Sequence, residues 1–458
     1  MNPLSKRRAG VLLHPTSLPS GRLDQAANDW IDWLASAGFS VWQLLPLGVP
    51  QENRSPYMCL SSFAINPAMM DTAHIAAYLD SAPLVDFLHW YRENRDWLDD
   101  YALFRVIRAR NADRPWYEWP AEYRQRDPDT LARLQSAASQ ELNAIILQQF
   151  ALHTRWHEVR DYARQRGIYI FGDLPIFVAH DSADVWAHQD SFMLDEHGLA
   201  THVAGVPPDY FSAEGQRWGN PQYNWNTLQD NDFDYWTKRL NHQLQHFDLL
   251  RIDHFRGLQA VWMIDASKEG ASQGYWQEVP GTDLLKQLGR NRGILPLVAE
   301  DLGTITPEVE ALRKRFDLPG MAVLQFAWDG SSDNPHLPEN ITPDRVAYTG
   351  THDNDTTAGW FASLDNAVQN KIMSHLEIDQ ADTVLAAFID AALNSAAQLA
   401  VIPLQDLLGL DSSARMNTPG TDMGNWSWQF QGTDLNPRLA AVFKAKIIHS
   451  NRCVAHDA

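Results

Sequence analysis

Eight short apolar runs recur along the chain, and segments with helical periodicity separate them. Apolar runs that alternate with amphipathic helices predict βα units around a parallel sheet, and eight strands are the number that closes a (β/α)8 barrel. The sequence therefore predicts an α/β fold, a (β/α)8 TIM barrel. The predicted strands are GVLLH (10–14), VWQLLP (41–46), IYIFGDLP (168–175), FDLLRID (247–253), ILPLVAED (294–301), MAVLQFAW (321–328), RVAYTGTHD (345–353) and LAVIPLQD (399–406).

Two of the connections are too long to be simple barrel loops. Residues 47–167 contain amphipathic stretches such as DYALFRVIRARN, so we expect a mostly helical inserted subdomain there. Residues 176–246 include a segment dense in Gly, Pro and aromatic residues, which predicts a loop-rich insertion over the barrel mouth. No separate C-terminal β-domain is indicated after the eighth run. We expect residues 1–458 to form a single barrel domain that carries these two insertions.

The charge balance narrows the classes of partner. The chain has 37 Lys and Arg against 57 Asp and Glu, a formal net charge of −20 at pH 7. A field of that sign repels phosphate backbones and anionic lipids, so we expect neither a nucleic-acid nor a membrane partner. The substrate expected from this balance is neutral or cationic.

Cysteine usage and the first residues bear on the compartment. The two cysteines, Cys59 and Cys453, lie far apart and show no metal-type spacing. The basic start MNPLSKRRAGVLLHP is followed by an apolar run shorter than the core of a signal peptide. These features predict a cytoplasmic protein without a disulfide framework.

Four carboxylates lie at or near the ends of different predicted strands. Asp253 follows LLRI, Glu300 follows LPLVA, Asp353 follows AYTGTH, and Asp173 follows IYIFG. Strand ends meet at one face of a barrel, so these groups are expected to converge although they are far apart in sequence. Converging carboxylates suit the cleavage of a glycosidic bond, in which one is a nucleophile or base and another is an acid.

The stretch LLRIDHFRG adds a positive charge to this group. Arg251 precedes Asp253 by two residues, so both side chains are expected on the same face of the strand. The guanidinium is then placed to hold Asp253 ionised. His254 and His352 stand next to Asp253 and Asp353 and offer hydrogen-bond donors suited to sugar hydroxyls.

Two other interpretations of the acidic residues remain open. An Asp at a strand end often caps the following helix, and Asp301 and Asp355 are candidates for that role. Alternatively, Asp, Glu and His that converge in a barrel can bind a divalent metal in a hydrolase or isomerase. The chain has no HExxH motif, and Arg251 beside Asp253 would repel a cation. We therefore expect no metal site.

Several long strings give the chain a family resemblance. They are SPY (55–57), FGDLPIFV (171–178), GVPPDYFSAEGQRWGNPQYNW (205–225), LLRIDHFRG (249–257), AEDLG (299–303), YTGTHDNDT (348–356), IPLQDLLGL (402–410) and RMNTPGT (415–421). In this order they resemble the amylomaltases, the 4-α-glucanotransferases of glycoside hydrolase family 77, over nearly the whole chain. The resemblance implies an amylase-like barrel and a retaining mechanism on α-1,4-glucans without a separate organic cofactor.

The resemblance also implies roles for individual residues. The nucleophile falls on Asp253, the general acid/base on Glu300, and a transition-state-stabilising role on Asp353. The expected substrates are maltooligosaccharides and α-1,4-glucans, with glucose as an acceptor. A hydrolase with the same residues and a non-catalytic glucan-binding relative are the alternatives. Implied substrate contacts are Tyr57, Ser55, Asp173, Asp209, Gln216, Trp218, Arg251, His352 and Asn425.

Overall fold

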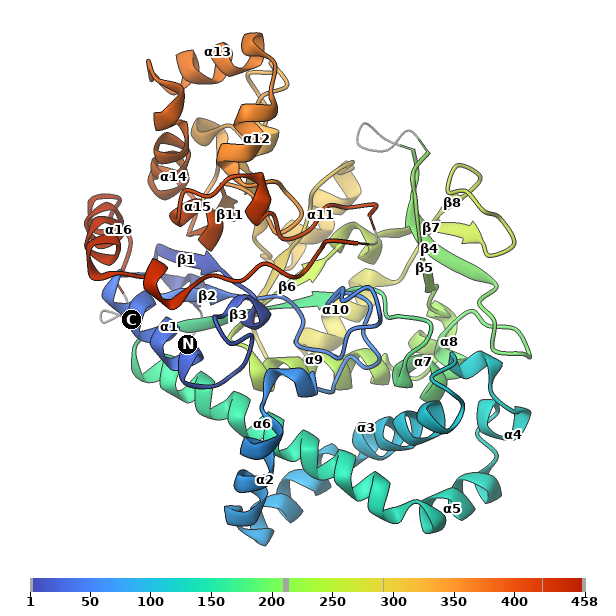
Figure 1. The fold of residues 1–458 in the computed structure, drawn as a ribbon. Coiled ribbons are helices and arrows are strands. Elements are labelled where there is room, and N and C mark those ends of the chain that lie inside the picture. The colour runs from blue at the N-terminus through green and yellow to red at the C-terminus, as the bar shows by residue number, and fades with distance from the viewer. Residues whose placement is uncertain (1–2, 209–213, 291, 422, 455–458) are drawn as a thin grey trace.

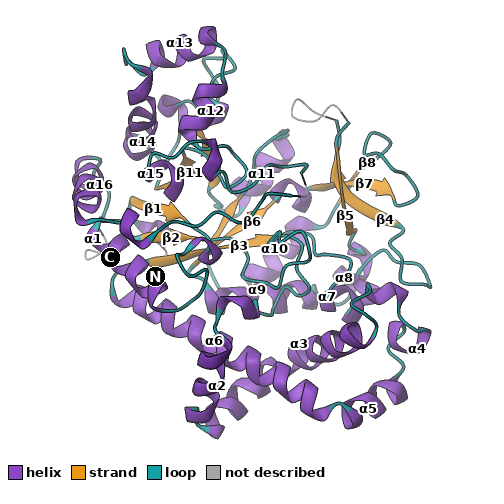
Figure 2. Ribbon diagram, viewed as in Figure 1, coloured by secondary structure: helices purple, strands orange, loops and turns teal. Residues whose placement is uncertain are grey.

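A parallel sheet of eight strands forms the centre of the computed structural model, which describes residues 3–208, 214–290, 292–421 and 423–454 (Figures 1 and 2). Each of the eight predicted runs contributes one strand. In spatial order the strands are β10 (Gly320–Val323), β11 (Arg345–Tyr348), β12 (Leu399–Pro403), β1 (Arg8–Leu12), β2 (Val41–Gln43), β3 (Tyr169–Pro175), β6 (Leu249–Asp253) and β9 (Leu297–Ala299).

The two edge strands of this sheet, β9 and β10, meet and close it. The Ala299 N–H donates to the Pro319 carbonyl oxygen at 2.8 Å. Two residues beyond β9, the Asp301 carboxylate accepts the N–H of Met321 in β10 at 2.7 Å. The predicted (β/α)8 barrel is therefore confirmed, with a side chain replacing part of the regular strand ladder at the closure.

All eight strands contribute buried side chains to the barrel interior, as expected for a packed core. Leu249 belongs to this interior cluster, so the period-2 alternation of β6 also turns Arg251 and Asp253 inward. The same holds for Phe171 and Asp173 in β3. The interior cluster comprises Leu12, Val41, Leu45, Phe171, Leu249, Val298, Met321, Val323, Val346, Tyr348, Leu399 and Val401.

Several predicted strands are longer than the observed ones. The run 321–328 leaves the sheet after Val323 and continues as a 3-10 turn over Leu324–Phe326, and the run 345–353 leaves it after Tyr348. The turn after β10 begins with the buried Leu324, and the residues after β11 begin with the buried but polar Thr349. Hydrophobicity therefore predicted where the strands are, but not the residues at which their hydrogen bonding to neighbouring strands ends.

Helices surround the barrel, and α1 and α16 lie side by side near both ends of the chain (Figure 1). Helix α1 begins where the Asp24 carboxylate caps the N–H of Ala26, and it buries Trp30, Ile31 and Leu34 against the barrel. The surrounding helices are α1 (Gln25–Ser36), α6 (Ser139–Gln165), α9 (Asp234–His246), α10 (Gly281–Gly289), α11 (Pro307–Arg315), α14 (Val384–Asn394) and α16 (Pro437–His449).

The connection between β2 and β3 is mostly helical. Helix α6 packs along α3, and both are 27 residues long (Figure 1). The division of the chain into one barrel domain with inserted subdomains stays a prediction. The other helices of this connection are α2 (Thr72–Ser81), α3 (Leu84–Arg110), α4 (Ala121–Arg124) and α5 (Pro128–Ala137).

A second, antiparallel sheet stands beside the barrel, in the order β5-β4-β7-β8, and was not predicted (Figure 2). Its first two strands fall in the connection expected to be loop-rich, and the other two follow β6. Gly and Pro hid the strand pattern of β5, whose sequence is QRWGNP. The strands are β4 (His202–Val206), β5 (Gln216–Pro221), β7 (Ala260–Asp265) and β8 (Tyr275–Glu278).

A small group of helices between β11 and β12 was also not predicted (Figure 1). After β12 the described residues contain the one-turn helix α15, two 3-10 turns and helix α16, and no further strand. The remaining helices are α7 (Ala183–Ala187), α8 (Trp225–Asp230), α12 (Thr357–Ser363), α13 (Asn366–His375) and α15 (Leu404–Leu407).

Candidate active site

The register of three neighbouring strands assembles the centre of the site. Parallel pairing sets Asp173 of β3 beside Arg251 of β6, and pairs Ile252 of β6 with Ala299 of β9. The next residues along β6 and β9 are Asp253 and Glu300. The predicted convergence of these groups at the carboxyl ends of the strands therefore follows from strand register rather than from loop conformation.

Arg251 connects two of the carboxylates directly. Its Nη2 donates to Asp173 Oδ2 at 2.7 Å and to Asp253 Oδ1 at 2.9 Å, and its Nε donates to Asp173 Oδ2 at 3.0 Å. The side chains of Arg251 and Asp173 are 5% and 0% exposed, whereas that of Asp253 is 31% exposed. Asp253 is thus the most exposed member of this cluster.

Tyr57 extends the network to His352, which follows strand β11. Its hydroxyl donates to Asp173 Oδ2 at 2.7 Å and accepts from Arg251 Nη2 at 2.9 Å. His352 Nε2 lies 2.9 Å from the same hydroxyl, so the network assigns the Nε2–H tautomer to this histidine. Burial raises the pKa of the Tyr57 hydroxyl and lowers that of the His352 imidazole, so both groups are neutral near pH 7.

Three rings form a wall around this network. Tyr57 stacks on His352 with ring centroids 5.3 Å apart, and Trp426 lies 6.1 Å from Tyr57 and 5.8 Å from His352. The flat faces of such rings are suited to the apolar face of a sugar. Trp426 was missed from the sequence because it falls beyond Asn425, the last residue to which the family comparison was extended.

Backbone donors hold Glu300. Its Oε2 accepts the N–H of His254 at 2.7 Å, and its Oε1 accepts the N–H of Leu302 at 3.2 Å. His254 adopts a left-handed backbone with φ of 53°, a conformation that costs energy for a residue other than glycine. This strained turn directly after β6 aims the His254 N–H at Glu300.

The pKa values of Glu300 and Asp253 both shift upward. Burial raises the pKa of Glu300 to about 7, against the lowering effects of Arg251 and the His254 N–H. Burial also raises the pKa of Asp253 well above its usual range, and Arg251 opposes this shift. We had expected charge pairing with Arg251 to hold Asp253 ionised. Burial has the larger effect on the pKa of Asp253, so this pairing alone does not set its ionisation. A proton shared by the two carboxyls favours Glu300, since Asp253 directly accepts the guanidinium N–H.

The third carboxylate has a different environment. Asp353 is 48% exposed, its Oδ1 accepts from Asn417 Nδ2 at 2.6 Å, and its Oδ2 lies 3.4 Å from His352 Nε2. Arg415 Nη2 donates to the Asp353 backbone carbonyl at 2.7 Å. Asn417 and Arg415 were not predicted as site residues, although both lie in the string RMNTPGT that carried the resemblance.

Comparison with known proteins shows which family the chain is similar to. The model of a family described as 4-alpha-glucanotransferase matches residues 12–85 and 79–435. A 4-alpha-glucanotransferase of Synechocystis sp. is 43% identical, covering 95% of this chain and 96% of its own length. That of Thermus thermophilus is 41% identical, covering 96% and 98%. The solved amylomaltase from Streptococcus agalactiae in complex with acarbose superposes with a TM-score of 0.94 at 30% identity, covering 98% and 100%.

The chain belongs to the 4-alpha-glucanotransferase family. Membership in this family makes the protein a transferase that acts on α-glucans, and the barrel with its shared amylomaltase fold agrees with the sequence-based expectation. The resemblance inferred from the motif strings is confirmed.

The remaining predicted contacts lie on strand β5 and on loops around the barrel mouth. Trp218 packs edge-on against His254 with centroids 4.9 Å apart and donates its Nε1–H to Gln216 Oε1 at 3.0 Å. Ser55 Oγ accepts the N–H of Tyr57, and the Asn425 amide is engaged with Thr418 and Thr421 of its own loop. Asp209 lies outside the described residues.

The two alternative roles for acidic residues can also be compared with the structure. Asp301 bonds Met321, Arg345 and Arg313 at the barrel closure and does not cap a helix. Asp355 Oδ1 accepts the N–H of Thr356, and its Oδ2 accepts from Ser412. Within the described residues, the carboxylates of the barrel mouth do not group with a third ligand closely enough to hold a metal ion.

None of the helices in the described part of the chain combines the length and the apolar character needed to cross a bilayer. Both cysteines are free thiols, Cys59 and Cys453.

Proposed function

We propose that the protein transfers a segment of a 1,4-α-glucan to the 4-hydroxyl of an acceptor glucose or glucan by a retaining double displacement. Glu300 protonates the glycosidic oxygen while an Asp253 carboxylate oxygen attacks the anomeric carbon. The leaving fragment departs with that proton, and a β-linked glucosyl ester forms on Asp253. Glu300 then removes the proton of an acceptor 4-hydroxyl, whose oxygen displaces the Asp253 carboxylate and restores the α-linkage.

The observation that supports these roles most strongly is the bond from Arg251 to Asp253. The Arg251 guanidinium, 2.9 Å from Asp253 Oδ1, favours the anionic form of the Asp253 carboxylate. Glu300 receives only neutral backbone donors, and its pKa of about 7 suits a group that gives and takes a proton near neutrality. For this retaining pair we expect the carboxyl groups to be about 5–5.5 Å apart in a substrate complex.

Asp353, Asp173 and His352 are proposed to bind hydroxyls of the sugar at the cleavage point. Asp173 Oδ1 is buried without a hydrogen-bond partner among the described residues, so it is available to accept from a hydroxyl. The half-exposed Asp353 carboxylate is held by Asn417 and can accept two further hydroxyl donors. Negative charge at both positions also stabilises an oxocarbenium-like transition state.

Transfer rather than hydrolysis requires that a sugar reaches the glucosyl ester before water does. Trp218 and Gln216 on β5, next to His254, are proposed to bind the acceptor and exclude water. Tyr57, Ser55, Asp209 and Asn425 complete the proposed substrate contacts. We further propose that glucose is an acceptor and that the protein works in the cytoplasm, which the two free thiols support.

Incubation with maltotriose tests the proposal. A transferase releases glucose and forms longer maltooligosaccharides, whereas a hydrolase gives shorter products and a non-catalytic binder leaves maltotriose unchanged. Separation of the products by chromatography distinguishes these outcomes. Mainly shorter products would replace the transferase assignment with a hydrolase.

Replacement of the nucleophile tests the assigned roles. We expect Asp253→Ala to lower transglycosylation of maltotriose by roughly 10³- to 10⁶-fold, because loss of a covalent nucleophile removes the whole pathway. Circular dichroism checks that the variant is folded. Added azide offers a small anion in place of the carboxylate and should yield a glycosyl azide. Near-normal turnover in this variant would contradict the nucleophile assignment.

A further inference from the structure

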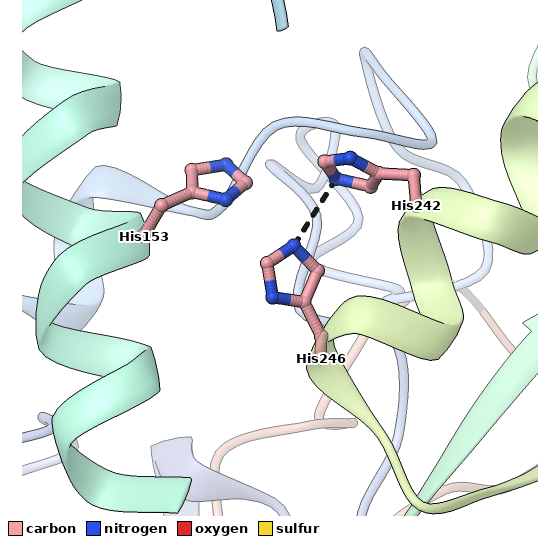
Figure 3. A group of neighbouring side chains, drawn as sticks. All are labelled: His153, His242 and His246. Atoms are coloured by element: carbon pink, nitrogen blue, oxygen red, sulfur yellow. Dashed lines mark hydrogen bonds between the residues drawn. The ribbon is translucent and has the colours of Figure 1, made fainter. Parts of the chain in front are cut away.

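Three histidines converge between two helices, away from the barrel mouth. His153 comes from α6, and His242 and His246 lie one turn apart on α9, with their rings directed into the same space (Figure 3). One ring nitrogen from each lies within 4.8 Å of the others. The residues are only 1%, 6% and 4% exposed, so they form a closed cluster inside the protein.

The spacing of these nitrogens is close to that of a metal centre. Zinc binds imidazole nitrogen at about 2.0–2.1 Å, which places two nitrogens of a tetrahedral site about 3.3–3.4 Å apart. His242 Nε2 and His246 Nε2 are already 3.3 Å apart. The third nitrogen, from His153, lies within 4.8 Å of these two, so it must move closer to share the ion.

The protonation state and the unpaired atoms also favour a ligand. Burial lowers the pKa of His242 to about 4 and those of His153 and His246 well below the usual range, so all three rings are neutral and offer lone pairs at pH 7. His153 Nε2 and His246 Nδ1 are buried without a hydrogen-bond partner within the described residues. Buried polar atoms of this kind are normally satisfied by a partner or an ion.

We propose that His153, His242 and His246 bind one Zn²⁺ ion, or a similar borderline transition-metal ion, that ties α6 to α9. Neutral imidazoles suit zinc, copper and nickel better than magnesium or calcium, which prefer oxygen ligands. Arg160, a cation near His246, is paired with Asp248 at 2.8 Å and does not oppose the ion with its full charge.

A fourth ligand is available from two directions. His157 lies one turn beyond His153 on α6, and its ring centroid is 5.1 Å from that of His246. Alternatively, a cavity of about 50 Å³ lined in part by His246, Gln243 and Phe63 has room for a water ligand. Either ligand completes the four-coordinate geometry typical of zinc in proteins.

The cluster can also be understood as ordinary core packing. His242 Nε2 lies 2.9 Å from the Phe63 carbonyl oxygen, and the Trp97 ring packs 5.5 Å from His153 and 5.3 Å from His242. This packing accounts for His242, but it leaves the unpaired nitrogens of His153 and His246 without explanation. An ion bound by the Nε2 atoms gives His153 Nε2 a partner and replaces the contacts of His242 Nε2 with Phe63 and His246.

The sequence contains a signal for this site that we did not use. His242 and His246 are four residues apart, as are His153 and His157, so each pair lies on one face of its helix. We looked for the HExxH motif and therefore expected no metal. The spacing between the histidines, without the Glu, was the relevant pattern.

The position of the site indicates a structural role. His246 lies three residues before β6, the strand that ends in Asp253, and α6 leads into β3, which carries Asp173. An ion shared by α6 and α9 therefore braces the two helices that precede the central strands of the active site. We expect metal removal to lower thermal stability.

The test begins with protein expressed in zinc-supplemented medium, so that burial of the site does not prevent loading. After gel filtration, elemental analysis should give about one zinc per chain. Protein unfolded with chelator and refolded with Co²⁺ should show the intense visible absorption of a tetrahedral site. Refolding with Zn²⁺ should raise the melting temperature by a few degrees over the metal-free protein.

Matched variants locate the ion. His153→Gln and His246→Gln should each weaken Co²⁺ binding by at least about 100-fold, whereas His89→Gln should leave it unchanged, because His89 is exposed on α3 and paired only with Glu93. The proposal would be overturned, whatever the variants do, if wild-type protein binds less than one zinc per chain and its Co²⁺ form lacks the absorption of a tetrahedral site. Equal binding by wild type and both cluster variants would overturn it as well, since it would place the ion on surface histidines.

Discussion

At the scale of single residues, the site depends on two carboxyl groups whose environments differ. Asp253 shares a guanidinium with Asp173, and Glu300 is held by backbone N–H groups. Burial raises the pKa of both, and in the proposed mechanism Glu300, with a pKa of about 7, carries the proton that is transferred.

The pKa of Glu300 predicts how activity depends on pH. The acid acts in its protonated form, which is present below a pKa of about 7 and is lost as the pH rises through it. We expect kcat/KM for maltotriose to fall about tenfold per pH unit above that value. Initial rates between about pH 5 and 9 measure this limb.

A fluoride substrate provides the control for the pH profile. Fluoride leaves without protonation, so formation of the glucosyl ester from α-maltosyl fluoride should not show the alkaline limb. If both substrates lose activity together above pH 7, the limb reports a different ionisation and the role of Glu300 as acid is wrong.

At the scale of elements, two devices position the site: the closure of the barrel and the antiparallel sheet next to its mouth. The closure depends on Asp301, the residue after Glu300. Its carboxylate accepts the N–H of Met321 and pairs with Arg313 and Arg345. The antiparallel sheet depends on the close approach of β4 and β5, which carries Gln216 and Trp218.

Asp301→Asn tests the closure. The carboxylate is buried, and Arg313 and Arg345 lose their shared anion in the variant, so we expect a loss of about 3–5 kcal/mol in the free energy of unfolding. Urea denaturation measures this loss. Asp379→Asn, a change at an exposed position of the same residue type, should be neutral. A stability loss below about 1 kcal/mol would mean that the charges at the seam are dispensable.

Gly205→Ala tests the antiparallel sheet. A Cβ at this position would lie 2.1 Å from the backbone oxygen of Gln216, so β5 must move away from β4. A displacement of about 1 Å can reduce turnover by up to about 100-fold, and we expect transfer products to fall more than hydrolysis products. Gly432→Ala, with no atom within 4 Å of the new Cβ, is the matched control. Unchanged product ratios would remove β5 from the acceptor site.

At the scale of the whole molecule, the sequence predicted the barrel from eight apolar runs that alternate with helices, and the central residues from their positions at strand ends. Each strand is apolar on its interior face until its last residues, and Arg251 and Asp253 continue that face. The antiparallel sheet was missed because Gly and Pro interrupt the strand pattern of β5 and because β4 pairs with the sequence-distant β7. The helices between β11 and β12 were missed as well. Asn417 and Trp426 were missed because long-range folding, not local pattern, brings them to the site.

Arg251 also determines how little the site has to rearrange during turnover. In the proposed reaction Asp253 loses its negative charge each time it becomes an ester and regains it when the acceptor arrives. The guanidinium makes two bonds to the fully buried Asp173, at 2.7 and 3.0 Å, that do not involve Asp253. The cation is therefore never left without a counterion, and the protein and its solvent need little reorganisation as charge moves onto and off the sugar.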